Sequence, residues 1–230
     1  SVLVSKKGAV SIKTRRKDQA PAPLPDMSHD RSKRYILPEG EPVDFLVSLG
    51  VQTPDGKVVR AKYDKFRQIN RYLEFIEDVL EKLPAGRTIR IVDFGCGKSY
   101  LTFGMYYYLN RIQGRDIRVT GLDLKADVIG RCSRLAEELH YDGLRFRQWD
   151  ISDYEDAEKV DMVVSLHACD KATDYALEKA VKWGADVILA VPCCQHELNG
   201  QIQCGELPHI LSYGVIKERV AALITDALPA

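Results

Sequence analysis

The sequence has no excess of charge of either sign and no apolar run long enough to cross a membrane. Its 33 basic and 33 acidic residues give a formal net charge of zero, so the whole chain has no general attraction to nucleic acid or to an anionic surface. A membrane-spanning helix needs about 20 consecutive apolar residues, and we find none, no internal repeat and no secretory leader. These absences argue against a membrane or repeat protein and predict a cytoplasmic one.

The six cysteines also lack the short spacings that are typical of zinc sites. Cys193 and Cys194 are adjacent, and neighbouring thiols rarely bind one ion together. We therefore predict no resident metal. A metal site is the less favoured interpretation of five residues near the end of the chain, namely His167, Cys169, Cys193, Cys194 and His196. Cys96 and Cys132 are predicted to be small buried apolar residues. Without a leader, the thiols are expected to be reduced.

The first 34 residues differ from the rest of the chain because they contain nine basic residues and only three acidic ones. Two short apolar segments, 2–4 and 10–12, predict a small hairpin, and the proline-rich stretch 20–25 predicts an extended linker. This basic arm could bind RNA, although charges that protect a sheet edge explain it as well. We predict an appendage at 1–34, a connecting segment at 35–60 and a main domain at 61–230.

A glycine-rich turn at residues 95–99 follows the apolar strand that ends at Asp93. A phosphate-binding P-loop would require glycine where Val92 stands, and the dinucleotide pattern G-x-G-x-x-G would require it at Tyr100. An acid followed by Gly95 and Gly97 fits best the first motif of S-adenosylmethionine-dependent methyltransferases, with Ser99 in place of a further glycine. The sequence therefore predicts a loop that binds the amino-acid part of this cofactor.

Two more acids follow predicted strands. The segment 117–123 ends in Asp123, 28 residues after Gly95, where a ribose requires a hydrogen-bond acceptor. The segment 144–149 is followed by Asp150, which could accept from an adenine amino group. Both acids could instead be ordinary turn residues. The predicted cofactor contacts are Asp93, Gly95, Gly97, Lys98, Asp123, Leu124, Asp150 and Ile151.

Strands and helical patterns alternate along the main domain. Apolar runs at 160–166 and 186–191 predict two further strands. The helical patterns between strands comprise Val128, Ile129, Cys132, Leu135, Ala136 and Leu139, then Ala176, Leu177, Ala180 and Val181 after the capping candidates Asp170 and Thr173. This order predicts an α/β fold, a Rossmann-like doubly wound and mostly parallel sheet whose ligand crevice lies at the carboxyl ends of the strands.

Reactive side chains follow the fourth and fifth predicted strands, in His167-Ala168-Cys169-Asp170 and in Pro192-Cys193-Cys194-Gln195-His196-Glu197. Together with the run 93–103, these motifs resemble a group of predicted S-adenosylmethionine-dependent methyltransferases. Its eukaryotic members include a ribosomal-RNA-adenine-dimethylase-domain-containing protein and a glutathione-transferase-C-terminal-domain-containing protein. The resemblance extends from Lys65 to the C-terminus. It implies an acceptor side formed by His167, Asp170, Pro192, Cys193 and Cys194, and Gln195 and His196 adjoin these residues as substrate contacts.

The acceptor-side residues are compatible with more than one chemistry. His167 is the candidate base for a nitrogen or oxygen acceptor. Adenine-N6 enzymes carry an Asn-Pro-Pro-aromatic clamp that this chain lacks. Pyrimidine-C5 methylation uses cysteine nucleophiles, for which Cys169 with Cys193 or Cys194 would be suitably placed. We expect RNA as the first acceptor and protein as the second.

Several structural expectations concern the surroundings of this site. A long helix before the glycine loop is predicted from Phe66, Ile69, Leu73, Ile76 and Leu80, with a stop at 84–86 and a polar face containing Lys62, Lys65, Arg67, Asn70 and Arg71. The segment 195–208 is predicted to be a substrate loop. Methyltransferase sheets of this type end in an antiparallel pair of strands. The sequence shows no pattern for this pair after the last helical segment, so we expect the main domain to be incomplete at its C-terminus.

Two other classes of protein remain open. A cofactor-binding or metal-binding interaction protein would have the same loop and no turnover. An NAD-dependent oxidoreductase would also place an acid at position 123.

Overall fold

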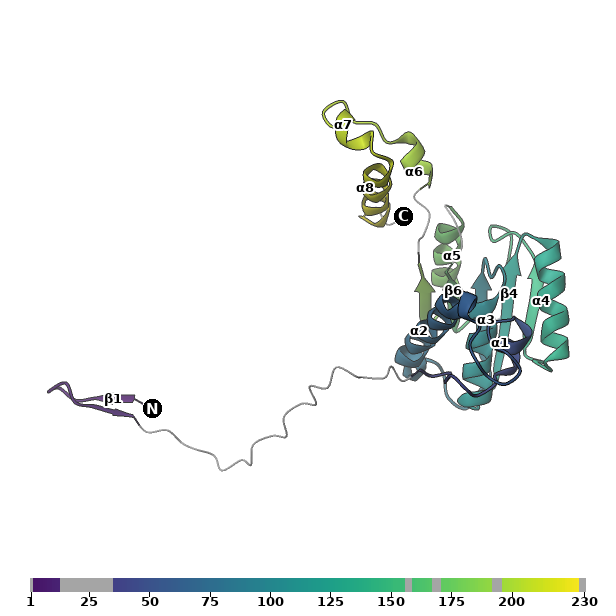
Figure 1. The fold of residues 1–230 in the computed structure, drawn as a ribbon, viewed down its shortest axis with the longest axis horizontal. Helices are drawn as coiled ribbons and strands as arrows, with labels where there is room; N and C mark the ends of the chain where they lie inside the picture. Colours follow the sequence, from purple (N-terminus) through teal and green to yellow (C-terminus); the bar gives the residue numbers. More distant parts are fainter. Residues whose placement is uncertain (1, 13–34, 156–158, 167–170, 192–195, 228–230) are drawn as a thin grey trace. The chain divides into compact units, whose positions relative to one another are not determined.

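The computed structural model describes residues 2–12, 35–155, 159–166, 171–191 and 196–227. The chain forms two compact units, residues 1–34 and 35–230. The first unit contains the predicted antiparallel hairpin of β1 (Val2–Val4) and β2 (Val10–Ile12) (Figure 1). The second unit contains the sheet and the helices that surround it.

Five parallel strands form the sheet of the second unit. They are β3 (Ile89–Phe94), β4 (Ile117–Asp123), β5 (Leu144–Gln148), β6 (Met162–Ser165) and β7 (Val187–Ala190). Their order is β5-β4-β3-β6-β7, which confirms the predicted α/β fold. The chain runs outward from β3 to β5 and then returns to β6 on the other side of β3. A ligand crevice is therefore expected beyond the carboxyl ends of β3 and β6, where the strand order reverses.

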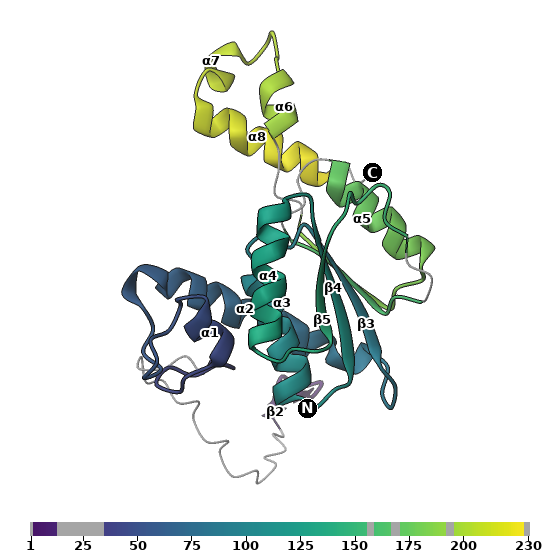
Figure 2. The same ribbon diagram turned by 90° about the vertical axis from the view of Figure 1, so that its right-hand side faces the viewer.

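Helices precede, connect and follow these strands. They are α1 (Asp44–Ser48), α2 (Tyr63–Val79), α3 (Tyr100–Tyr106), α4 (Ala126–Glu138), α5 (Lys171–Lys182), α6 (His196–Gln201), α7 (Pro208–Leu211) and α8 (Gly214–Ala227), with short 3-10 turns η1 (Arg60–Lys62) and η2 (Leu80–Lys82) and a π-helix η3 (Tyr107–Ile112). Figure 2 shows α3 and α4 on one side of the sheet and α5 on the other. Within the described residues, no helix is both long and apolar enough to cross a bilayer.

The sheet separates two hydrophobic cores because successive strand residues point to opposite faces. Ile91, Val119 and Phe146 pack with α2, α3 and α4. Val92 and Phe94 belong to the smaller core against α5. In that core the Phe94 ring stacks on Trp183 with 6.0 Å between centroids. The two cores fix the strand ends from both sides.

Helix α2 has the predicted apolar face, but one polar residue lies on the wrong side. Asn70 was expected at the surface and is instead completely buried. Its Oδ1 accepts from the Leu37 backbone N–H at 2.8 Å, and its Nδ2 donates to the Phe66 carbonyl at 3.3 Å. Two hydrogen bonds offset the cost of burying the amide. Asn70 therefore attaches the segment before α1 to α2.

Predictions near the end of the chain were less accurate. Thr173 was expected to cap a helix and is a buried residue inside α5, while Val181 was expected on the apolar face of α5 and is 73% exposed. The predicted loop 195–208 begins with helix α6, although Asn199 and Gly200 disfavour helix. Helix α6 packs against α8. After β7, the described residues form α6, α7 and α8 and no strand.

Candidate active site

The loop between β3 and α3 has a positive φ angle at three positions. Gly95 and Gly97 have φ angles of 68° and 52°, and Ser99 has a φ of 57°. Positive φ costs glycine little but is uncommon for other residues. Ser99 therefore adopts the conformation for which the sequence pattern has glycine, with its side chain buried and its Oγ 3.2 Å from the Gly97 carbonyl.

We expect Ser99→Gly to change the free energy of unfolding by less than about 1 kcal/mol. The substitution relieves a left-handed serine, worth about 1–2 kcal/mol, but it loses the Oγ hydrogen bonds and gives the unfolded chain more freedom. Ser99→Val should destabilise by more than about 2 kcal/mol, because a β-branched residue fits this backbone poorly. Urea unfolding measures both, and a valine variant as stable as the parent would contradict the strained loop.

Asp123, at the end of β4, holds the glycine loop in place. Its Oδ2 accepts from the Gly97 backbone N–H at 2.9 Å, and its Oδ1 accepts from the Lys125 N–H at 2.9 Å. The Cys96 N–H also donates to the Leu122 carbonyl at 3.0 Å. A Cβ added to Gly97 would meet only the Gly95 carbonyl, at 3.9 Å. The loop is thus anchored from β4, and the space above Gly97 stays open for a ligand.

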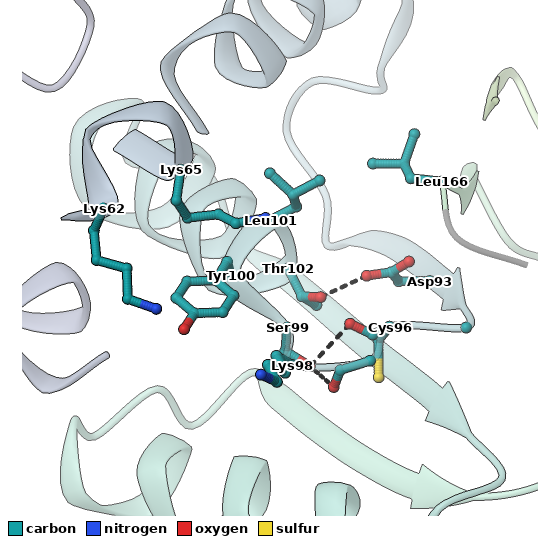
Figure 3. Close-up of a pocket in the computed structure, with 12 residues that line it drawn as sticks. Lys62, Lys65, Asp93, Cys96, Lys98, Ser99, Tyr100, Leu101, Thr102 and Leu166 are labelled. Atoms are coloured by element: carbon teal, nitrogen blue, oxygen red, sulfur yellow. Dashed lines mark hydrogen bonds between the residues drawn. The ribbon is translucent and has the colours of Figure 1, made fainter. Parts of the chain in front are cut away.

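A cavity of about 370 Å³ lies beside this loop (Figure 3). It is lined by Lys62, Lys65, Asp93, Gly95, Cys96, Gly97, Lys98, Ser99, Tyr100, Leu101, Thr102 and Leu166. Four of the predicted cofactor residues are among them, namely Asp93, Gly95, Gly97 and Lys98. Leu166 follows β6, so the cavity lies at the reversal of strand order. Its volume is in the range of small-molecule sites.

Asp93 is the acidic residue among those that line the cavity. Its side chain is buried at the end of β3, and Thr102 Oγ1 donates to its Oδ2 at 2.6 Å. Burial raises the pKa of Asp93 to about 7, and the neighbouring Asp123 adds to the increase while the Thr102 hydrogen bond opposes it. The carboxylate therefore lacks a cationic partner within the described residues. A ligand with a positive charge would provide one.

Three lysines give the cavity a cationic part. Lys62 belongs to η1, Lys65 to α2 and Lys98 to the glycine loop. Burial, followed by repulsion from Lys62 and Lys98, lowers the pKa of Lys65. Lys65 Nζ donates to Gln68 Oε1 at 2.6 Å and lies 5.3 Å from the centre of the Tyr100 ring. One cavity thus offers both a carboxylate and ammonium groups, which suits a ligand with charges of both signs.

Sequence reasoning did not assign Lys62, Lys65, Tyr100 or Thr102 to the cofactor. Lys62 and Lys65 precede the loop by about 30 residues and reach it only because α2 packs against α3. Thr102 could have been identified from the sequence because it is a polar residue in the first turn of an otherwise apolar helix.

The other four predicted contacts, Asp123, Leu124, Asp150 and Ile151, do not line the cavity. Leu124 is 62% exposed. Asp150 accepts from the Ser152 N–H and Oγ at 2.9 and 2.8 Å, and these bonds lower its pKa. This is the geometry of an ordinary turn, the alternative interpretation of Asp150. Ile151 packs against the smaller core. Their contact with a cofactor remains a prediction.

The predicted acceptor side falls largely outside the described residues. This applies to His167, Cys169, Asp170, Pro192, Cys193, Cys194 and Gln195, while His196 is the first residue of α6. Cys96 and Cys132 are buried, as predicted, and burial raises the pKa of both thiols, so neither is an activated nucleophile. Within the described ranges, no three His, Cys, Asp or Glu side chains are arranged to hold a metal ion.

Three solved structures illustrate what the chain is similar to, all at low sequence identity. Coclaurine N-methyltransferase bound to N-methylheliamine and SAH is 17% identical with a TM-score of 0.39, over 50% of this chain and 33% of that one. Geranyl diphosphate methyltransferase in complex with SAM is 20% identical with a TM-score of 0.39, over 53% and 46%. YjhP from E. coli is 21% identical with a TM-score of 0.36, over 60% and 51%. The chain thus spans a third to about half of these proteins.

A family comparison covers most of the second unit. No curated protein sequence matches the chain. The sequence model of the family described as Methyltransferase domain matches residues 64–201, from the start of α2 to the end of α6. The matched region includes the glycine loop, Asp93, Asp123 and the sheet. Because it makes up more than half of the 230 residues, the chain belongs to this methyltransferase family.

Proposed function

We propose that the protein is an S-adenosylmethionine-dependent methyltransferase that acts on RNA in the cytoplasm. The observation that carries the proposal is the cavity beside the glycine loop, which lies almost entirely within the region matched by the methyltransferase family. A buried carboxylate without a cationic partner among the described residues and three lysines share that cavity. Both charges have a counterpart in the amino-acid part of S-adenosylmethionine.

The residues present fit this cofactor. Asp93 would face a positive charge of the bound molecule, and the lysines would face its carboxylate. Gly95 and Gly97 leave room for close approach because neither has a Cβ. Asp123 would accept from the ribose while it holds the Gly97 N–H. Leu124, Asp150 and Ile151 are proposed to surround the adenine. The cofactor, when bound, supplies a methyl group on a positively charged sulfur.

The protein's own residues would position the acceptor and remove its proton. We propose His167 as the base, with Asp170 beside it, because an imidazole titrates near neutral pH. Cys193 and Cys194 would complete the catalytic group, and Pro192, Gln195 and His196 would contact the substrate. Alignment of the acceptor atom with the methyl group then accounts for most of the rate increase. The excess of basic residues in the segment 1–34 supports an anionic acceptor such as RNA.

Thermal unfolding with S-adenosylmethionine, S-adenosylhomocysteine, NAD and ATP tests the cofactor. A ligand at about a hundred times its dissociation constant adds roughly 2.7 kcal/mol, which raises the Tm by on the order of 5–10 °C for a chain of this size. We expect the increase only with the first two ligands. Asp123→Ala should abolish it because both the ribose acceptor and the Gly97 anchor are lost.

Asp127→Ala is the matched control, since this exposed acid lies on α4 and pairs with Arg131 at the surface. It should retain the ligand effect. An increase with NAD that Asp123→Ala abolishes would favour an oxidoreductase instead. Labelled-methyl transfer to fractionated cell RNA and protein then identifies the acceptor. Binding of S-adenosylmethionine without transfer to either fraction would favour an interaction protein without turnover.

A further inference from the structure

Three arginines lie on one face of the sheet, away from the cofactor cavity. Arg118 is on β4, and Arg145 and Arg147 are on β5. The register pairs Thr120 with Arg145 and Leu122 with Arg147. Paired residues share a face, so the arginines are on the same face as Leu122 of the smaller core. Among the described residues, helix α5 packs against β6 and β7 rather than against β4 and β5, so α5 does not cover the arginines.

A cavity of about 620 Å³ opens on this face. Its lining includes Arg90, Arg118, Arg145 and Arg147 and two acids, Asp142 and Glu155. Glu155 already contacts Lys179 and Lys182, at 3.3 and 2.9 Å.

Arg118, Arg145 and Arg147 are exposed, and none of the three forms an ion pair with another described residue. The face therefore carries positive charge that the described part of the chain does not neutralise.

An exposed tryptophan continues the row of arginines. Trp149 follows Arg145 and Arg147 at intervals of two residues. Its backbone N–H donates to the Asp123 carbonyl at 3.2 Å, so the pairing with β4 continues past β5. Its side chain is 45% exposed, although the ring contacts Tyr154 edge to face at 6.1 Å. Asp123 also holds the glycine loop. The row thus ends beside the proposed cofactor site.

Edge protection does not explain this arrangement. Charged residues on an outer strand prevent unwanted sheet pairing, and β5 is an outer strand. Arg118, however, lies on β4, which is paired on both sides. Guanidinium groups bind phosphates through paired hydrogen bonds. A cationic groove next to an exposed aromatic ring is the combination that binds single-stranded nucleic acid, because phosphates and a stacked base are held together.

We infer that Arg118, Arg145, Arg147 and Trp149, here called the arginine face, bind single-stranded RNA through consecutive phosphates and one stacked base. The inference rests on the proposed function in one respect, since it locates the path of the RNA acceptor toward the cofactor site. RNA binding itself requires no methyl transfer and can be measured separately.

The test is fluorescence anisotropy of a labelled oligouridine of about 20 nucleotides with the full chain, from about 50 to 200 mM KCl. The triple variant Arg118→Gln, Arg145→Gln, Arg147→Gln should weaken binding at least tenfold at the lower salt concentration. Loss of three phosphate contacts should also reduce the slope of log Kd against log salt by about 2, because each contact to a single strand contributes about 0.7. Trp149→Ala should weaken binding about tenfold, and Trp149→Phe should restore it.

The matched control removes the same charge elsewhere, with Arg67→Gln, Arg134→Gln and Arg219→Gln on α2, α4 and α8. It should leave both the affinity and the salt slope unchanged. Circular dichroism and the thermal response to S-adenosylmethionine verify that every variant is folded. Unaltered RNA binding in the triple variant overturns the inference. The inference is also overturned if RNA binding is lost when Arg15, Arg16 and Lys17 of the basic arm become glutamine but is retained in the triple variant.

Two further outcomes separate this inference from the proposed function. A parent protein that binds S-adenosylmethionine but not the oligouridine would contradict RNA binding by the arginine face and leave the proposed cofactor unaffected. A parent protein that binds the oligouridine but not S-adenosylmethionine would contradict the proposed cofactor and support RNA binding by the arginine face. Sedimentation with phosphatidylserine vesicles, lost in the triple variant while no RNA binding is found, would identify the face as a membrane contact and contradict the inference.

Discussion

Asp93→Asn should make the ligand-free protein more stable at pH 8 and should weaken its binding of S-adenosylmethionine. The pKa of the buried Asp93 is about 7, against about 3.9 for an aspartate in an unfolded chain. Keeping it ionised at pH 8 therefore costs on the order of 4 kcal/mol, since each pKa unit corresponds to about 1.36 kcal/mol. Asparagine removes this cost and can still accept the hydrogen bond of Thr102.

The sign of the pH dependence follows from the raised pKa. Between about pH 4 and 7, the folded state binds a proton that the unfolded state has released, so this group lowers the stability as the pH rises. Asp93→Asn should remove that decrease, with a gain in Tm of up to about 10 °C at pH 8 and little gain at pH 4. Scanning calorimetry at both pH values measures it.

The same variant should lose cofactor affinity by on the order of a hundredfold, because a charged hydrogen bond contributes about 1.5–3 kcal/mol. In the parent protein, affinity for S-adenosylmethionine should increase as the pH rises through about 7, when Asp93 becomes ionised. Isothermal titration calorimetry measures both effects. Asp127→Asn, on the exposed face of α4, is the control and should change neither stability nor affinity. An asparagine variant that binds with parental affinity would exclude Asp93 from the cofactor site.

Arg87→Ala should destabilise the protein more than the loss of an exposed ion pair would, although Arg87 does not line the cavity. Arg87 Nη1 and Nη2 donate to the two carboxylate oxygens of Asp161 at 2.9 and 2.6 Å, and the Arg90 backbone N–H donates to Asp161 Oδ2 at 2.9 Å. Asp161 is completely buried beside the start of β6. Removal of the arginine leaves a buried charge without its partner, which is strongly destabilising.

Urea unfolding of Arg87→Ala, Asp161→Ala and the double variant measures the coupling between the two side chains. Burial by itself raises the pKa of Asp161, but the hydrogen bonds from Arg87 and from the Arg90 N–H outweigh it, so the pKa is lowered. The stabilisation should therefore be present above about pH 4 and be lost as the pH falls below this value. Lys57→Ala is the control, because its pair with Asp55 is exposed and should contribute little to stability. A loss of similar size in Arg87→Ala would contradict the structural role.

Local sequence patterns predicted the parts of the site that depend on neighbouring residues. The predicted second strand, 117–123, matches β4, because a strand is recognised from β-branched residues and its end from the turn that follows. The glycine loop was predicted for the same reason, including the unusual position of Ser99. Asp150 shows the limit of such patterns, since an acid after a strand can bind a ligand or simply close a turn.

Contacts between distant segments could not be predicted in this way. Asn70 was placed on the polar face of its helix, yet it binds the backbone of Leu37, which precedes it by 33 residues. Helix α6 forms in a segment with Asn199 and Gly200, where α8 packs against it. In both cases a tertiary contact outweighs the local preference.

The sequence by itself determined the α/β fold, the position of the glycine loop and the acids at the strand ends, because these features follow from periodicity and backbone conformation within short segments. Only the tertiary structure decided that Asp93 is buried beside Thr102, that Lys62 and Lys65 reach the glycine loop, and that the arginines of two strands share one face. The physical reason is that burial, pKa and charge depend on which segments pack together, and packing joins residues far apart in the chain.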